Sequence, residues 1–170
     1  MRPRLLALAL LSLPACVPHV LPLLPEPAPV AVRADLPLDV VTKLAGAQDP
    51  LQIKGTSWQF SELEHAVARA VTTAAAPWAE AHRADRPGGW QIQVDLIKSD
   101  AEWVDGHART SLGVRATLRA VTGRVYIGQN QMFCSTAGLA KSEQETRDVL
   151  WRCIRGLGRS VTGWLDGVTP

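Results

Sequence analysis

Two stretches of alternating sequence decide the fold: WQIQVDL at 90–96 and SLGVRATLRAVTGRVYIGQNQMF at 111–133. In the first, every second residue from Trp90 to Leu96 is apolar, which is typical of a strand with one buried face. The second predicts two more strands, 111–120 and 124–133, because Thr122-Gly123 is a tight-turn signal between them. Residues 99–107 are interpreted as a connection. We therefore expect an antiparallel meander with one apolar face.

An amphipathic helix is expected before these strands, at 61–76. Apolar residues recur there every three or four positions, and Ser61 and Glu64 have the spacing of a capping box. Pro77 lacks an amide hydrogen and is expected to end or kink the helix, and a loop should follow at 85–89.

A second helix is expected after the strands, at about 142–165. Ser142 and Glu145 repeat the capping-box spacing. Gly156 and Gly158 weaken a helix relative to alanine, so close packing against the sheet is the expected reason for them.

The predicted order is (β)αβββα, an α+β two-layer sandwich with both helices on one face of a small antiparallel sheet. Residues 39–54 are ambiguous, although Leu51-Gln52-Ile53 alternates and could begin a strand. Residues 39–170 are long enough for one domain with one modest core, and we expect a single domain there.

The N-terminus has the three parts of a bacterial lipoprotein signal peptide. Arg2 and Arg4 are followed by the apolar residues 5–13, a run too short to cross a bilayer, and then by Ala15 and Cys16. We expect residues 1–15 to be removed and Cys16 to be lipidated. The alternative is ordinary signal cleavage that leaves Cys16 as a plain thiol.

Residues 16–38 are interpreted as a lipidated cysteine and a proline-rich tether. Six prolines between 17 and 37 exclude a helix or an interior strand, so this segment should hold the domain away from the membrane.

The remaining cysteines and the charge balance fit an envelope protein. Cys134 and Cys153 are expected to form a disulfide between the third strand and the last helix, the alternative being two buried thiols. Without Arg2 and Arg4 the mature chain has 16 basic and 16 acidic side chains, because the whole chain has 18 and 16. A chain without net charge gives no support for binding nucleic acid.

The sequence predicts neither catalysis nor a cofactor. The four histidines lack the spacing of metal ligands, and the cysteines lack a Cys-x-x-Cys arrangement. Gly156-Leu157-Gly158 lies inside a predicted helix rather than after a strand, so it is no dinucleotide fingerprint. We expect no enzymatic activity, no metal and no cofactor.

Three surface features are candidates for contact with a partner or lipid. Arg152, Arg155 and Arg159 share one face of the last helix; this is either a solvated face, with Asp148 pairing to Arg152, or a site for phosphate or an acidic partner. Trp103 lies among polar residues and is either an interface residue or folds back on the core. The polar face of the second strand carries the arginines Arg109, Arg115 and Arg119.

The segments 90–96, 113–118 and 122–126 and the helix from Ser142 together resemble the auxiliary lipoproteins of ABC-type lipid transport systems. They are also similar, more loosely, to the lipopolysaccharide-assembly lipoprotein, and they cover about half of the mature chain. Residues 30–60 depart from that pattern, because they lack clear paired strands. The resemblance implies a non-catalytic accessory role and transfers no specific functional residue except Cys16.

We therefore expect a lipid-anchored envelope lipoprotein that assists a transport complex, with the membrane and an envelope protein as partners. Val17, rather than aspartate, after Cys16 favours the outer membrane, facing the periplasm. The alternatives are an activator that binds a cell-wall synthase and a hydrolase whose site is not recognised, for which His107 and Asp105 would be the first residues to test.

Overall fold

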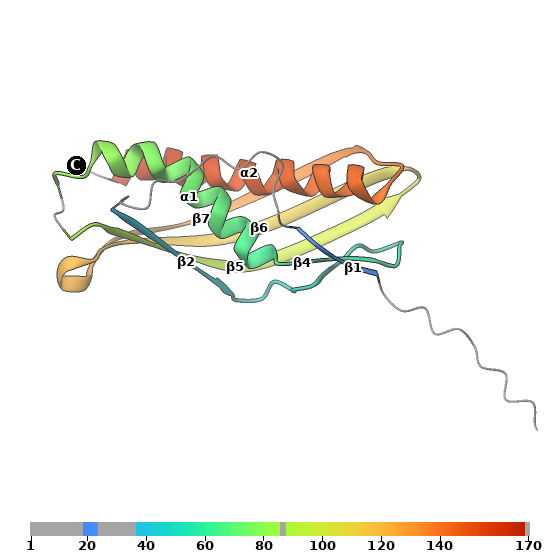
Figure 1. Ribbon diagram of the computed structural model, residues 1–170, viewed down its shortest axis with the longest axis horizontal. Helices are drawn as coiled ribbons and strands as arrows, with labels where there is room; N and C mark the ends of the chain where they lie inside the picture. Colours follow the sequence, from blue (N-terminus) through green and yellow to red (C-terminus); the bar gives the residue numbers. More distant parts are fainter. Residues whose placement is uncertain (1–18, 24–36, 86–87, 169–170) are drawn as a thin grey trace, which may run out of the picture.

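The computed structural model describes residues 19–23, 37–85 and 88–168, and the expected α+β class is confirmed there (Figure 1). The expected order lacked several strands. The elements are β1 (His19–Pro22), β2 (Leu38–Leu44), β3 (Leu51–Gln52), β4 (Trp58–Ser61), α1 (Leu63–Ala81), β5 (Trp90–Val104), β6 (His107–Ala120), the 3-10 turn η1 (Thr122–Arg124), β7 (Val125–Leu139) and α2 (Glu143–Val168).

The large sheet has the strand order β2-β5-β6-β7 and is mixed rather than purely antiparallel. The expected meander of β5, β6 and β7 is present. However, β2 pairs in parallel with β5, with Leu38 opposite Trp90 and Leu44 opposite Leu96. The reason is the helix α1 between them, because a helical crossover returns the chain in the same direction.

The prediction of a connection at 99–107 is wrong, because β5 continues through most of these residues. The strand runs to Val104, and β6 begins at His107 after the two-residue turn Asp105-Gly106. Both turn residues have positive φ, 50° and 76°, as a tight hairpin turn requires. The strand β7 is also longer than expected and reaches Leu139.

Part of the segment interpreted as a tether belongs to the fold. His19–Pro22 forms β1, the edge strand of a small sheet with the order β1-β4-β3, and pairs in parallel with Trp58–Ser61. Proline fits there because an edge strand need not donate every amide. Leu23 then enters the core with no exposed surface. The rest of the expected tether at 24–36, the signal peptide at 1–15 and Cys16 lie outside the described residues.

The first helix departs from the expected 61–76 at both ends. Ser61 ends β4, and its hydroxyl donates to the Leu21 carbonyl at 3.3 Å instead of forming a capping box. Pro77 does not end the helix, which continues to Ala81. Pro77 is on the exposed side, so water can reach the carbonyl that it leaves without a donor.

The second helix agrees more closely with expectation. The Glu145 amide donates to Ser142 Oγ at 3.2 Å, and the Glu145 carboxylate accepts from the Lys141 amide. Gly158 is close to α1 rather than to the sheet, because a Cβ there would lie 2.7 Å from the Ala70 carbonyl oxygen. A Cβ at Gly156 would meet no atom within 4 Å, so close packing does not explain that glycine.

Both helices cover the same face of the large sheet, as expected (Figure 1). One core joins the helix stripes, the inward residues of the large sheet and Leu51, Ile53 and Phe60 of the small-sheet region. The small sheet continues along β5 beyond the end of β2. There, the Lys54 amide donates to the Ala101 carbonyl at 3.0 Å and the Trp103 amide donates to the Lys54 carbonyl at 2.8 Å.

Candidate partner-binding face

The other side of the large sheet, which we call the open face, lies opposite the two helices. Strand alternation brings side chains of four strands together there: Tyr126 of β7 is level with Arg119 of β6, and Arg119 is level with Gln91 of β5. The open face consists of Asp39, Val41, Lys43, Gln91, Gln93, Asp95, Arg115, Thr117, Arg119, Tyr126, Gln129, Gln131 and Phe133.

Two glutamines donate hydrogen bonds to the carboxylates of this face. Gln91 Nε2 donates to Asp39 Oδ2 at 2.8 Å, and Gln93 Nε2 donates to Asp95 Oδ1 at 2.9 Å. Arg119 makes a long contact of 3.4 Å to Gln93 Oε1, and the buried Arg115 Nε has no hydrogen-bond partner. A guanidinium carries five N–H donors, so Arg119 can donate to an incoming carboxylate or carbonyl through the nitrogens that do not contact Gln93.

Two aromatic side chains of β7 add apolar area to the open face. Tyr126 and Phe133 are 58% and 60% exposed. The Phe133 ring lies across Gly113 of β6, where a Cβ would come within 2.7 Å of the ring. Large aromatic and arginine side chains are the residue types enriched at the centres of protein interfaces.

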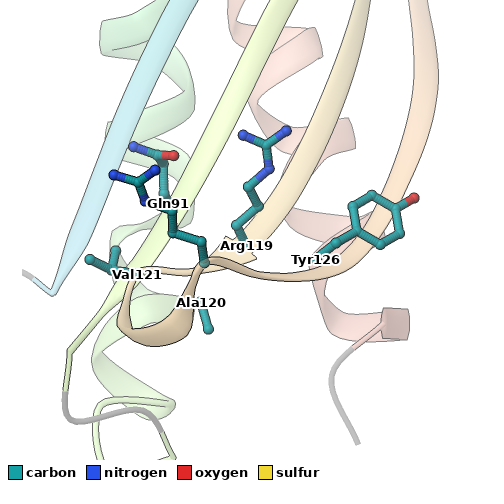
Figure 2. Close-up of a pocket in the computed structure, with 6 residues that line it drawn as sticks. Gln91, Arg119, Ala120, Val121 and Tyr126 are labelled. Carbon is teal, nitrogen blue, oxygen red and sulfur yellow. The ribbon is translucent and has the colours of Figure 1, made fainter.

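A hollow of about 640 Å³ lies at one end of the open face, and Figure 2 shows residues that line it. Arg119 of β6 and Tyr126 of β7 line the hollow from the sheet, and Val121 lines it from the turn between β6 and β7. The complete lining is Gln91, Arg119, Ala120, Val121, Arg124 and Tyr126. Two guanidinium groups without an acidic lining residue make this hollow a suitable place for an anionic or carbonyl-rich segment.

The structure places the sequence candidates apart from one another. Arg152, Arg155 and Arg159 are exposed on α2, in the layer opposite the open face, and Arg152 packs near Gly138 of β7. The expected partner of Arg152, Asp148, instead accepts a hydrogen bond from Gln144 at 3.0 Å. The arginines of the helix and those of the sheet therefore do not form one basic surface.

Trp103 folds back on the domain, which is the second of its two alternatives. Its Nε1 donates to the Ala140 carbonyl at 2.6 Å, and its ring meets that of Trp58 edge to face at 6.5 Å. Near this pair Lys54 Nζ contacts Asp100 Oδ1 at 2.6 Å, and this hydrogen bond raises the pKa of Lys54.

Cys134 and Cys153 are joined by a disulfide in the structure, with their Cα atoms 5.6 Å apart. The bond links β7 to α2, as expected, and Cys134 lies within the strand because β7 extends beyond the expected 124–133 to Leu139. Cys16 lies outside the described residues.

Within residues 19–23, 37–85 and 88–168, no cluster of histidine, cysteine and carboxylate side chains is arranged to hold a metal ion. His107 Nδ1 lies 3.0 Å from the Asp105 carbonyl oxygen, and His19 Nδ1 lies 3.2 Å from a Glu143 carboxylate oxygen. No helix in these ranges has the length and apolar character needed to span a bilayer.

The sequence pointed to Arg115 and Arg119 but missed Tyr126 and Phe133. Both aromatics lie on strand β7, where Ile127 interrupts the pairing register between Leu118 and Arg119. This irregularity changes which residues of β7 face outward. Only the structure shows that Tyr126 and Phe133 share the face of the two arginines.

Comparison with known proteins gives structural likeness only. No family model and no curated protein matches the sequence. A solved Xanthomonas campestris protein of family-model DUF330 has a TM-score of 0.56 at 9% identity, covering 86% of this chain and 94% of its own. A candidate lipoprotein from Caulobacter crescentus CB15 has a TM-score of 0.50 at 12% identity, covering 79% and 93%. These likenesses show a shared fold.

Proposed function

We propose that this protein is a lipid-anchored envelope lipoprotein that serves as a non-catalytic accessory component of a transport complex, with the open face as its docking surface. The observation that carries the proposal is the gathering of Tyr126, Phe133, Arg115 and Arg119 on a sheet face opposite the helices. The signal sequence that ends at Cys16 supports the lipid anchor. The Caulobacter neighbour, itself described as a candidate lipoprotein, is consistent with it.

The open face suits a protein partner better than the arginines of α2 do. Its two exposed aromatics can be desolvated, and its arginines can form directed hydrogen bonds, a combination that supports specific binding. The α2 arginines lie in the opposite layer from Tyr126 and Phe133, the exposed aromatic side chains of the described residues. They would be most useful for long-range attraction, which adds more to the association rate than to affinity.

The anchor is tested by replacing Cys16 with serine in the full chain. We expect loss of fatty-acid labelling and release from the membrane fraction, because no acyl chain can then be attached. Triacylated Cys16 should hold the protein without a second membrane signal, since two or more chains anchor stably. A wild-type mature protein that is not acylated would contradict the anchor, and fractionation of inner and outer membranes would test the outer-membrane assignment.

The docking surface is tested by affinity capture from solubilised membranes and identification of the captured proteins. We expect a permease or substrate-binding component with the wild-type protein and its loss with the double variant Tyr126→Ala/Phe133→Ala. The triple variant Arg152→Ala/Arg155→Ala/Arg159→Ala is the matched control and should retain the partner. Capture of a peptidoglycan synthase instead would favour the activator alternative and contradict the transport role.

A further inference from the structure

The start of β1 fixes how far the domain can lie from its anchor. His19 is paired with Trp58, and its amide donates to the Ser57 carbonyl at 3.1 Å. Cys16 precedes His19 by three residues, which span at most about 11 Å when fully extended. One headgroup layer is about 5–7 Å deep, because the bilayer is about 40–45 Å thick and its hydrocarbon core about 30 Å. Three extended residues therefore reach only a few ångströms beyond that layer.

A group of contacts joins β1 to one end of the domain, which we call the anchor end. Trp58, opposite His19, meets Trp103, and Trp103 donates to the Ala140 carbonyl. The Ala140 amide in turn donates to the Gly106 carbonyl at 2.8 Å. The β5–β6 turn, the end of β7 and the start of α2 therefore lie near β1, and Figure 1 shows them at the end away from η1 and the C-terminus.

The anchor end exposes apolar side chains at its tip. Val104, His107 and Leu139 are cross-strand neighbours on the adjacent strands β5, β6 and β7. Val104 is 48% exposed and Leu139 is 68% exposed, the largest value among the exposed large hydrophobic residues of the described ranges. Exposed apolar side chains beside a lipid anchor can enter the bilayer surface without the full loss of freedom of a separate binding event.

The charged groups of the anchor end largely pair with one another. Lys54 contacts Asp100 at 2.6 Å, and Arg109 contacts Glu102 at 3.4 Å. Lys141, Asp105 and Glu145 add charges of both signs. This end therefore has no strong excess of positive charge, and its contact with a bilayer should depend little on anionic lipid.

We infer that the anchor end rests on the bilayer that holds the acyl chains of Cys16, with Val104 and Leu139 among the lipid headgroups. This inference rests on the proposed lipid anchor and replaces the expectation of a domain held away from the membrane. Strand β5 has 15 residues, so the hollow beside Arg119 lies about 45 Å farther from the lipid when the strands stand upright. The end of the domain that carries this hollow would then project away from the membrane.

The test uses single cysteines in the full lipidated protein. An added cysteine is the one reactive thiol, since Cys16 would be acylated and Cys134 is bonded to Cys153. An environment-sensitive fluorophore is attached to Val104→Cys or Leu139→Cys and, as matched controls at the opposite end, to Val121→Cys or Val125→Cys, which are 46% and 51% exposed. The vesicles contain phosphatidylethanolamine, phosphatidylglycerol and a lipid with a headgroup nitroxide quencher.

We expect the nitroxide lipid to quench the probes at 104 and 139 and to leave those at 121 and 125 emitting. Quenching should be unchanged when the share of phosphatidylglycerol is altered. Equal quenching at both ends would overturn the inference, as would no quenching in protein that mass analysis shows to be acylated. A signal at 104 and 139 that depends on protein density rather than on the nitroxide would show that Val104 and Leu139 contact a second copy of the chain, and would also overturn the inference. Absence of acylation would instead contradict the proposed anchor.

Discussion

Trp151 on α2 donates a hydrogen bond from its indole Nε1 to the main-chain carbonyl of Leu23, at 3.2 Å across 128 positions of sequence. Arg147 Nη2 donates to the same oxygen at 2.7 Å. Leu23 directly follows β1 and is fully buried. The N-terminal strand is therefore held to the last helix as well as to β4.

Replacing Trp151 with phenylalanine should destabilise the domain by about 2 kcal/mol. The change removes one hydrogen bond to a buried carbonyl and leaves a smaller ring in the core. Urea denaturation measures the loss. Trp164→Phe is the control, because Trp164 is only partly buried, and a similar cost in both variants would show that the bond to Leu23 contributes little.

Gly158→Ala and Gly156→Ala should have opposite effects although they lie two positions apart in α2. At Gly158 the added methyl group meets the Ala70 carbonyl oxygen and must separate the helices, which costs about 1–3 kcal/mol. At Gly156 nothing lies within 4 Å, so alanine should stabilise the helix by about 1 kcal/mol. Thermal unfolding of both variants checks the signs, and equal effects would contradict the close approach of the helices.

Removing the disulfide by Cys134→Ala/Cys153→Ala should lower the free energy of unfolding by about 3 kcal/mol. Cross-links that close loops of about this length restrict the unfolded chain by that amount. Denaturation of the double variant and the wild type gives the difference. Mass analysis under non-reducing conditions should show the oxidised pair, and reactive thiols in the wild type would rule out the bond.

Gly106→Ala should destabilise the β5–β6 hairpin by about 1 kcal/mol. Gly106 has a φ of 76°, and a Cβ there meets nothing within 4 Å, so the cost is conformational rather than steric contact with a neighbour. Asp105→Asn is the control, because asparagine is favoured at the first position of such a turn. Denaturation of the two variants is compared, and a loss of stability confined to Asp105→Asn would argue against this turn geometry.

The sequence predicted those elements whose residues alternate or recur with the period of a strand or a helix. The alternation of 90–96 and the stripe of α2 are visible in the sequence because one face of each is buried. The extension of β5 to Val104 was missed because the polar run around Asp100 hid the strand, although Asp105-Gly106 is a strong hairpin signal in its own right. Taken alone, the Asp105-Gly106 signal predicts strands that extend up to the turn on both sides.

Long-range pairing could not be predicted in the same way. The strand β1 has four residues and ends in proline, and nothing local distinguishes it from a tether. It becomes a strand because Trp58–Ser61 lies beside it and because Trp151 and Arg147 bind the next carbonyl. The open face depends likewise on register, since only the pairing of β6 with β7 brings Tyr126 level with Arg119.

The parallel pairing of β1 with β4 gives the N-terminus a mechanical property. When the residues before His19 are pulled along the axis of β1, the contacts of β1 with Trp58–Ser61 are loaded together in shear rather than opened one after another. Behind the strand, the buried Leu23 side chain and its two carbonyl bonds resist sliding. Tension between an anchored N-terminus and a partner at the opposite end would therefore be borne by the whole strand at once.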